Sequence, residues 1–207
     1  VMALSGGMDS TCLLMHYLAQ GYKAVCISYN YGQKHSIELE RAKSTIFMCM
    51  ECGLEVSHHI VDLSPAMSLF DSALTSAERN VPLGHYEEDQ MKQTVVPNRN
   101  AIFASILYGF ALSETKRTGE DVVLALGVHS GDHAIYPDCR PEFYDALQHA
   151  FEIGNWDSNR VGFDLPYLHG DKTSILEDAI ESCAMLGLDF DVVLKNTITS
   201  YNPDADG

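Results

Sequence analysis

Short apolar runs alternate along this chain with longer amphipathic stretches. The predicted strands span 1–4, 23–29, 55–63 and 122–128, and the predicted helices span 10–20, 36–52, 100–117, 141–153 and 172–186. Strands that alternate with helices build βαβ units, in which the strands run parallel and helices cover both faces of the sheet. We therefore expect an α/β fold with a doubly wound, mostly parallel sheet.

The pattern is interrupted once, at about residues 64–98, where prolines and an acidic cluster replace the periodicity. The α/β alternation resumes afterwards, so we interpret this segment as an insertion or lid within one domain that spans residues 1–207. A chain of 207 residues with 46% hydrophobic residues is long enough for a single core. The sequence starts with Val and stops in a polar stretch. We expect trimmed ends and a truncated or frayed tail at about 197–207.

The charge balance is strongly acidic, with 13 Lys and Arg against 29 Asp and Glu, a net charge of −16. Such a surface repels phosphate backbones and anionic lipids, so we expect no nucleic-acid partner and no membrane partner. The longest nearly apolar stretch, 101–112, is shorter than the roughly twenty residues that span a bilayer. Six scattered cysteines indicate core thiols rather than a secreted disulfide framework. These features fit a cytoplasmic protein.

A glycine-rich loop follows the first predicted strand and opens the first predicted helix. Its residues are Ser5, Gly6, Gly7, Met8, Asp9 and Ser10. Glycines let backbone N–H groups approach an anion, and the start of a helix adds unpaired donors and a positive dipole end. A simple turn with Ser or Asp capping is the alternative interpretation. The position after the first strand favours a phosphate-binding loop.

This SGGMDS loop resembles the pyrophosphate loop of the PP-loop ATP pyrophosphatases. The resemblance implies a Rossmann-like nucleotide-binding domain that uses ATP and Mg²⁺. Enzymes of that family cleave ATP between the α- and β-phosphates and adenylate an acceptor. The loop would then hold the leaving pyrophosphate, whose charge must be neutralised as the bond breaks.

Four of the few basic residues lie in loops marked by Gly, Pro or Asn: Lys34, Arg99, Arg140 and Lys172. Each follows a predicted strand or opens a predicted helix, which is the edge where open α/β sheets bind ligands. A solvated loop charge is the alternative for each one alone. Together they predict an anion-binding edge.

Four segments, in order, are similar to the 7-cyano-7-deazaguanine synthase family. They are SGGMDS, YGQKH, VPNRN and GDHAIYPDCRPEF. The resemblance implies an ATP-dependent ligase that adenylates the carboxylate of 7-carboxy-7-deazaguanine and converts it with ammonia to the nitrile, a precursor of queuosine. It also suggests a homodimer.

We assign the catalytic cations on the same basis. Lys172 would meet the phosphates, and Lys34 or Arg99 would meet the α-phosphate or the carboxylate. His35, His129 and His133 flank the site as proton shuttles or as hydrogen-bonding groups. Amide and nitrile formation needs no enzyme thiol, so a nucleophilic Cys139 is not expected.

The same resemblance implies that the GDHAIYPDCRPEF segment binds the base of the substrate. Asp132 or Asp138 would accept N–H groups of the guanine-like head, and Tyr136 or Phe143 would stack on the ring. The segment also includes Pro137 and Arg140. The alternatives are that Asp138 caps the next helix and that Tyr136 is a packed loop anchor.

The match fails near the C-terminus, where the family carries a zinc site held by four cysteines. Ser200 stands in place of the first of them, and a hydroxyl is a poor zinc ligand beside thiolate. We predict that residues 1–207 hold no zinc site. Three other functions stay open: transfer of the activated carboxylate to another amine, tRNA thiolation, and nucleotide binding without turnover.

Overall fold

A computed structural model describes residues 1–32, 37–70, 95–132 and 136–198 of the chain. Its centre is a five-stranded, all-parallel sheet in the order β3-β2-β1-β4-β5. The strands are β1 (Met2–Ala3), β2 (Ala24–Asn30), β3 (Val56–Asp62), β4 (Val122–Ala125) and β5 (Val161–Asp164). The order reverses between β1 and β4, which is the switch point of a doubly wound sheet.

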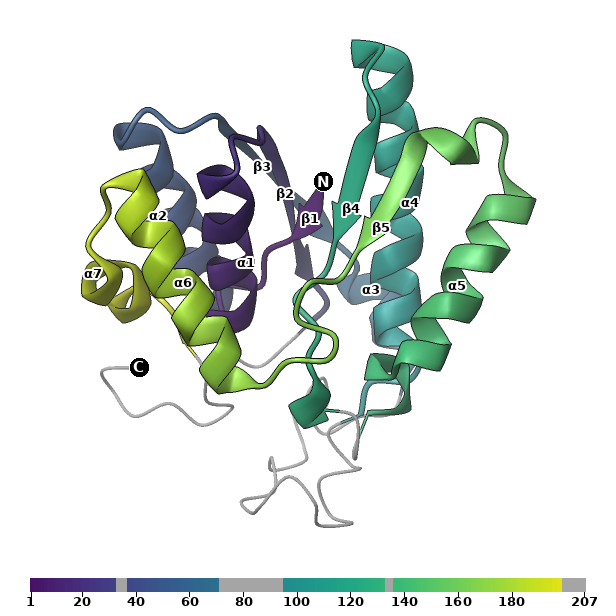
Figure 1. Cartoon of the computed structure of the whole chain (residues 1–207). Helices are drawn as coiled ribbons and strands as arrows, with labels where there is room; N and C mark the ends of the chain where they lie inside the picture. Colours follow the sequence, from purple (N-terminus) through teal and green to yellow (C-terminus); the bar gives the residue numbers. More distant parts are fainter. Residues whose placement is uncertain (33–36, 71–94, 133–135, 199–207) are drawn as a thin grey trace.

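Helices cover both faces of this sheet (Figure 1). The helices are α1 (Met8–Ala19), α2 (Ile37–Glu51), α3 (Ser64–Met67), α4 (Arg99–Thr118), α5 (Pro141–Gly154), α6 (Lys172–Leu186) and α7 (Phe190–Lys195). Buried residues of α1, α2 and α6 share one core cluster with β1, and those of α4 and α5 share another with β2 and β4. The predicted fold class is confirmed, because two cores on opposite faces define a doubly wound α/β fold.

Most predicted elements are present, with ends within one to three residues of the predicted ends, and helix 172–186 has the predicted bounds. Three elements were missed, β5, α3 and α7, because each is too short for periodicity to show. The predicted strand 122–128 ends earlier, at Ala125. Its last residues leave the sheet at the switch point, and a Cβ on Gly127 would lie 3.3 Å from the Asp9 backbone.

Five of the six cysteines are buried, as the core prediction expected, and Cys52 is the exception. Cys12, Cys26, Cys49 and Cys183 are buried in one cluster, and burial raises the pKa of the first three thiols to about 12. Cys52, at the end of α2, is exposed. Within the described residues no group of three His, Cys, Asp or Glu side chains is placed to hold a metal ion.

Part of the predicted insertion is seen: residues 64–67 form α3, while 71–94 lie outside the described residues. Lys34, His35 and His133 also lie outside them, as does Ser200.

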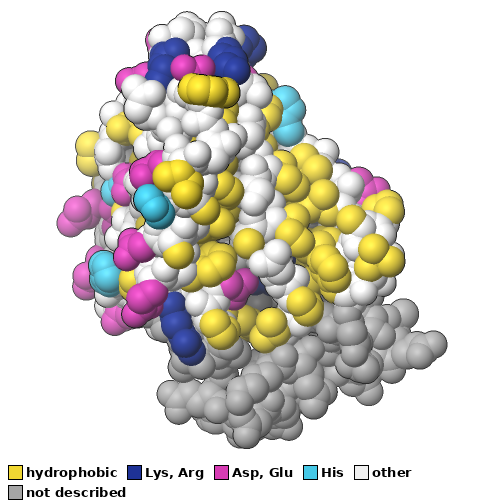
Figure 2. Space-filling view, turned by 90° about the vertical axis from the view of Figure 1, so that its right-hand side faces the viewer, with side chains coloured by type: hydrophobic (Ala, Val, Ile, Leu, Met, Phe, Trp, Pro, Cys, Tyr) yellow, Lys and Arg dark blue, Asp and Glu magenta, His cyan; other side chains and the backbone are white. Residues whose placement is uncertain are grey.

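No helix in the described part of the chain is long and apolar enough to cross a membrane. On the face over α4 and α5, Figure 2 shows many hydrophobic side chains at the surface, while Lys and Arg gather mainly at the top of the view, at the end away from the grey segments.

Candidate active site at the switch point of the sheet

The glycine-rich loop is held in shape by hydrogen bonds among its own residues. The Ser10 hydroxyl accepts from the Ser5 backbone N–H at 3.1 Å and donates to the Gly7 carbonyl at 3.2 Å. The Ser5 hydroxyl lies 3.0 Å from Ser10 Oγ and accepts from the Gly7 N–H at 3.1 Å. Both hydroxyls are therefore engaged within the loop, and these hydrogen bonds maintain its shape.

The start of α1 is left open for an anion. Gly7 is the N-cap residue, and no side chain in the described part of the chain caps the helix there. The N–H groups of Met8, Asp9 and Ser10 have no acceptor within the helix, as in any first helical turn. Backbone donors and the positive helix end together form the usual setting for a bound phosphate.

Gly6 makes this geometry sterically possible. Its φ is +86°, a left-handed conformation that favours glycine. A Cβ on Gly6 would lie 2.1 Å from the Glu38 carbonyl oxygen in the first turn of α2. The phosphate loop thus packs directly on the backbone of α2.

A buried histidine faces the loop from the other side of the switch point. His129, 2% exposed, follows β4, and its Nε2 lies 3.6 Å from Asp9 Oδ2. Its Nδ1 accepts the Gly131 N–H at 3.0 Å, which places the proton of the neutral ring on Nε2, facing the carboxylate. The other carboxylate oxygen, Asp9 Oδ1, is buried and has no hydrogen-bond partner among the described residues. An orphaned carboxylate oxygen beside a phosphate loop suits a hard cation such as Mg²⁺.

A cavity of about 260 Å³ opens beside the loop, at the carboxyl ends of the strands. Ser5, Asp9 and Ser10 line one side of it. Arg99 and Cys139 also line this cavity. Residues from the loop after β1, the start of α4 and the segment before α5 therefore meet at one site.

Arg99 is the first residue of α4 and is tied to aromatic and amide groups. Its guanidinium hydrogen-bonds to Tyr31; burial raises the pKa of Tyr31, and the positive charge of Arg99 partly opposes that rise. Arg99 Nε donates to Asn100 Oδ1 at 3.3 Å. The Asn100 amide donates in turn to the Asp138 carbonyl at 3.3 Å and to Cys139 Sγ at 3.4 Å. Asn100 thus links the cationic start of α4 to the predicted base-binding segment.

That segment forms a short 3-10 helix, Pro137–Cys139, which directly precedes α5. Tyr136 is 5% exposed and packs with Cys139, Val95 and Val128. No side-chain cap is made at the start of α5, so Asp138 does not cap that helix. Arg140 is exposed at the N-cap position.

The remaining predicted residues lie at the same edge. Lys172 is the first residue of α6, after the N-cap Asp171, whose carboxylate accepts the Ser174 N–H at 2.9 Å. The Gly170 carbonyl accepts from the Ser130 N–H at 3.0 Å, which joins the start of α6 to the loop after β4. Asp132 ends a 3-10 helix in that loop. Arg99, Arg140 and Lys172 are confirmed at helix starts.

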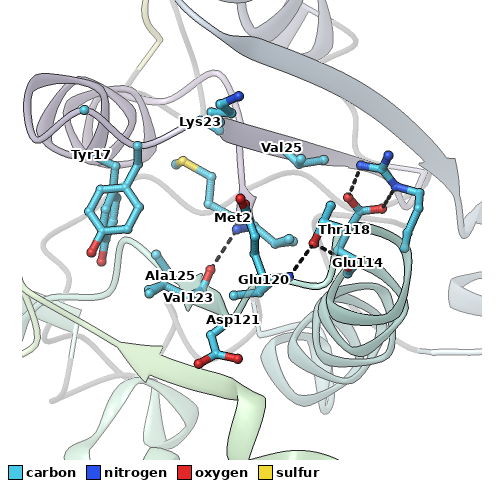
Figure 3. Close-up of a pocket in the computed structure, with 16 residues that line it drawn as sticks. Met2, Tyr17, Lys23, Val25, Glu114, Thr118, Glu120, Asp121, Val123 and Ala125 are labelled. Carbon is cyan, nitrogen blue, oxygen red and sulfur yellow. Dashed lines mark hydrogen bonds and ion pairs between the residues drawn. The ribbon is translucent and has the colours of Figure 1, made fainter.

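A larger cavity, of about 500 Å³, lies at the opposite edge of the sheet (Figure 3). Glu114, Glu120 and Asp121 line it, and Arg117 pairs with Glu114 on the same helix. It lies at the amino ends of the strands, away from the phosphate loop and from the edge where open α/β sheets bind ligands.

Sequence reasoning missed three contributors to the site. The pairing of His129 with Asp9 and the bridging role of Asn100 depend on contacts between distant segments. Ile198 was assigned to a frayed tail, yet it is 6% exposed and its N–H donates to the Gly6 carbonyl at 3.1 Å. Ile198 is thus joined to the phosphate loop by a backbone hydrogen bond, while residues 199–207 of the predicted tail lie outside the described residues.

The fold and the loop define a class: a nucleotide-binding α/β protein of the PP-loop type, with an uncapped helix start at the switch point of a parallel sheet. The chain belongs to the family described as "Queuosine biosynthesis protein QueC", whose model matches residues 1–207.

Curated relatives agree with this assignment. A 7-cyano-7-deazaguanine synthase of Marinomonas sp. (strain MWYL1) is 41% identical over 202 residues, covering 98% of this chain and 83% of the relative. One from Methanoregula boonei is 44% identical over 201 residues, covering 97% and 83%. Among solved structures, NMN synthetase from Francisella tularensis is similar with a TM-score of 0.46 and 14% identity, covering 93% of this chain and 63% of that one.

Proposed function

We propose that this protein is an ATP-dependent ligase that converts 7-carboxy-7-deazaguanine and ammonia to 7-cyano-7-deazaguanine. The observation that carries the proposal is a complete phosphate loop beside a cavity lined by Arg99, in a chain of the QueC family. Curated relatives that bear the name of this activity match nearly the whole chain.

The reaction needs two activations. In the first, a carboxylate oxygen attacks the α-phosphorus of ATP, the bond to the β-phosphate oxygen breaks, and pyrophosphate leaves. Ammonia then adds to the acyl carbon, and AMP and a proton leave to give the amide. In the second, the amide oxygen attacks another ATP, and the amide nitrogen loses a proton as pyrophosphate leaves. Loss of AMP and of the second N–H proton then gives the nitrile.

In both activations the phosphate loop would bind the departing pyrophosphate. The N–H groups of Met8, Asp9 and Ser10 are aimed by the start of α1 and need no rearrangement as charge develops, which is the condition for electrostatic stabilisation. Lys172, at the start of α6, would add a positive charge to the phosphates. Asp9 would hold Mg²⁺ through Oδ1, and the bound ion would neutralise phosphate charge.

The acceptor side would be formed by the start of α4 and the segment before α5. Arg99 lines the cavity and would bind the α-phosphate or the carboxylate, a role that Lys34 would share. For the base we keep Asp132, Tyr136, Pro137, Asp138 and Arg140 as the proposed binding segment. Because Tyr136 is packed, it would support the pocket wall rather than swing freely onto the ring.

Mass spectrometry of the product tests the proposal. The protein is incubated with ATP, 7-carboxy-7-deazaguanine and ¹⁵N-ammonia, and we expect one ¹⁵N in the nitrile and release of AMP rather than ADP. Asp9→Asn is the matched variant, since it keeps the shape of the side chain but removes the charge, and it should lose AMP release while remaining folded. Product formation that does not depend on ammonia would instead indicate another amine acceptor. No turnover of this substrate by the wild type would reject the proposal.

A further inference from the structure

The segment that follows α7 reaches back to the phosphate loop, although the two lie at opposite ends of the described chain. The Ile198 N–H donates to the Gly6 carbonyl at 3.1 Å. The Ile198 carbonyl oxygen would lie 3.3 Å from a Cβ placed on Gly7. Ile198 is 6% exposed, so this backbone contact is shielded from water.

The same segment is anchored to the helix that supports the loop. The Asn196 amide donates to the Thr45 hydroxyl of α2 at 3.2 Å, and Thr45 is fully buried. The first turn of α2 presents the Glu38 carbonyl to Gly6. The loop is therefore held between α2 on one side and residues 196–198 on the other.

The contact fixes the orientation of one peptide group. In a trans peptide the C=O and the N–H point in opposite directions. Since the Gly6 carbonyl is turned toward Ile198, the N–H of the same peptide, on Gly7, is turned inward, where it donates to Ser5 Oγ at 3.1 Å. A flip of this glycine peptide would point a carbonyl dipole into the loop and repel a bound phosphate.

We propose that residues 196–198 are a positioning segment of the nucleotide site: their backbone locks the Gly6–Gly7 peptide in its anion-binding orientation, so that pyrophosphate binding and attachment of this segment are thermodynamically coupled. The inference rests on the proposed pyrophosphate role of the loop. Coupling of this kind is reciprocal, so a ligand on the loop must also strengthen the attachment of Ile198.

Reciprocity supplies a test on the unmodified full chain. Amide hydrogen exchange of Ile198 is measured by NMR with and without Mg²⁺-pyrophosphate. We expect exchange of the Ile198 amide to slow by about fivefold or more on saturation, since opening of the segment then costs binding energy. The Gly119 amide, which is bonded to the Thr115 carbonyl at the far end of α4, serves as the control and should not change.

A pair of variants at Ile198 tests whether loss of this contact weakens pyrophosphate binding. Ile198→Pro removes the N–H donor, and Ile198→Val keeps the donor and an apolar side chain. Calorimetry should show about fivefold weaker pyrophosphate binding for the Pro variant, the loss expected for one net hydrogen bond, and unchanged binding for the Val variant. If the Pro variant fails to fold, the exchange measurement still decides.

The outcomes separate this inference from the proposed function. Slower exchange at Ile198 on binding, with Gly119 unchanged, supports the coupling. Tight pyrophosphate binding without any change at Ile198 overturns it and leaves the proposed function in place. If the wild type does not bind pyrophosphate at all, the role proposed for the loop fails, and the positioning segment fails with it.

Discussion

Gly6→Ala should damage both the fold and the nucleotide site, because the added methyl group meets backbone rather than a movable side chain. Its Cβ would lie 2.1 Å from the Glu38 carbonyl oxygen, 3.0 Å from the Glu38 carbonyl carbon and 3.1 Å from the Ala42 nitrogen. Ordinary van der Waals contact begins at 3.4 Å, so the first turn of α2 would have to retreat by about 1.3 Å, the difference between 3.4 and 2.1 Å.

Two costs add at this position. An alanine at φ +86° costs roughly 1 kcal/mol relative to glycine. Overpacking against fixed backbone costs roughly 1–3 kcal/mol. We therefore expect the free energy of unfolding to fall by about 2–4 kcal/mol, a large share of the roughly 5–15 kcal/mol available to a domain. Any relaxation that preserves the fold must displace the loop, so pyrophosphate binding should weaken as well.

Urea unfolding and calorimetric titration with pyrophosphate measure the two effects. Gly109→Ala is the matched control, since Gly109 is an exposed residue of α4 whose added Cβ would meet nothing within 4 Å. It should raise stability by about 0.5–1 kcal/mol, the helix propensity difference, and leave binding unchanged. A Gly6→Ala protein with wild-type stability and wild-type affinity would refute the steric reasoning.

Three further predictions concern the site and the core. His129→Ala should lower kcat/KM for ATP about 10- to 100-fold in pyrophosphate-release assays, because it releases Asp9, whereas His129→Gln, which keeps a donor near the Nε2 position, should retain most activity. Equal losses in the two variants would contradict the positioning role of His129. Tyr167→Phe should cost about 1–2 kcal/mol in urea unfolding, because the Tyr167 hydroxyl donates to the Asp178 carboxylate at 2.5 Å in a partly buried contact that also involves His16. An unchanged free energy of unfolding would show that this bond is dispensable. The free energy of unfolding should fall as pH rises from about 9 to about 12, because burial raises the pKa of the Cys12, Cys26 and Cys49 thiols to about 12, whereas the same thiols in the unfolded chain lose their protons near 9.0. A free energy of unfolding that stays constant up to pH 11 would argue against buried neutral thiols.

Local signals in the sequence were enough for most of the fold. Helix 172–186 has a clear apolar repeat and an Asp171 capping box, so both of its ends could be placed. Strand β5 could not, since Val161–Asp164 contains a glycine and is too short to show a period. The early end of β4 also escaped prediction, because it depends on the close approach of Gly127 to the backbone of Asp9.

For the site, sequence reasoning could place motifs at the binding edge but not the contacts between them. The SGGMDS loop was recognisable because its chemistry is contained in six consecutive residues. Which nitrogen of His129 faces Asp9 depends on the Gly131 N–H, and the support of Gly6 depends on Ile198. Pairings of this kind carry no local signal, since each partner alone is an ordinary loop residue.

The backbone bond between Gly6 and Ile198 has a consequence for the order of events during biosynthesis. The phosphate loop leaves the ribosome well before its partner, which is translated almost a whole domain later. Contacts of such long sequence separation form late and slow the overall folding rate. A nascent chain would therefore carry a loop with the right residues and a movable Gly6–Gly7 peptide, and it would gain full affinity for nucleotide only when translation has passed residue 198.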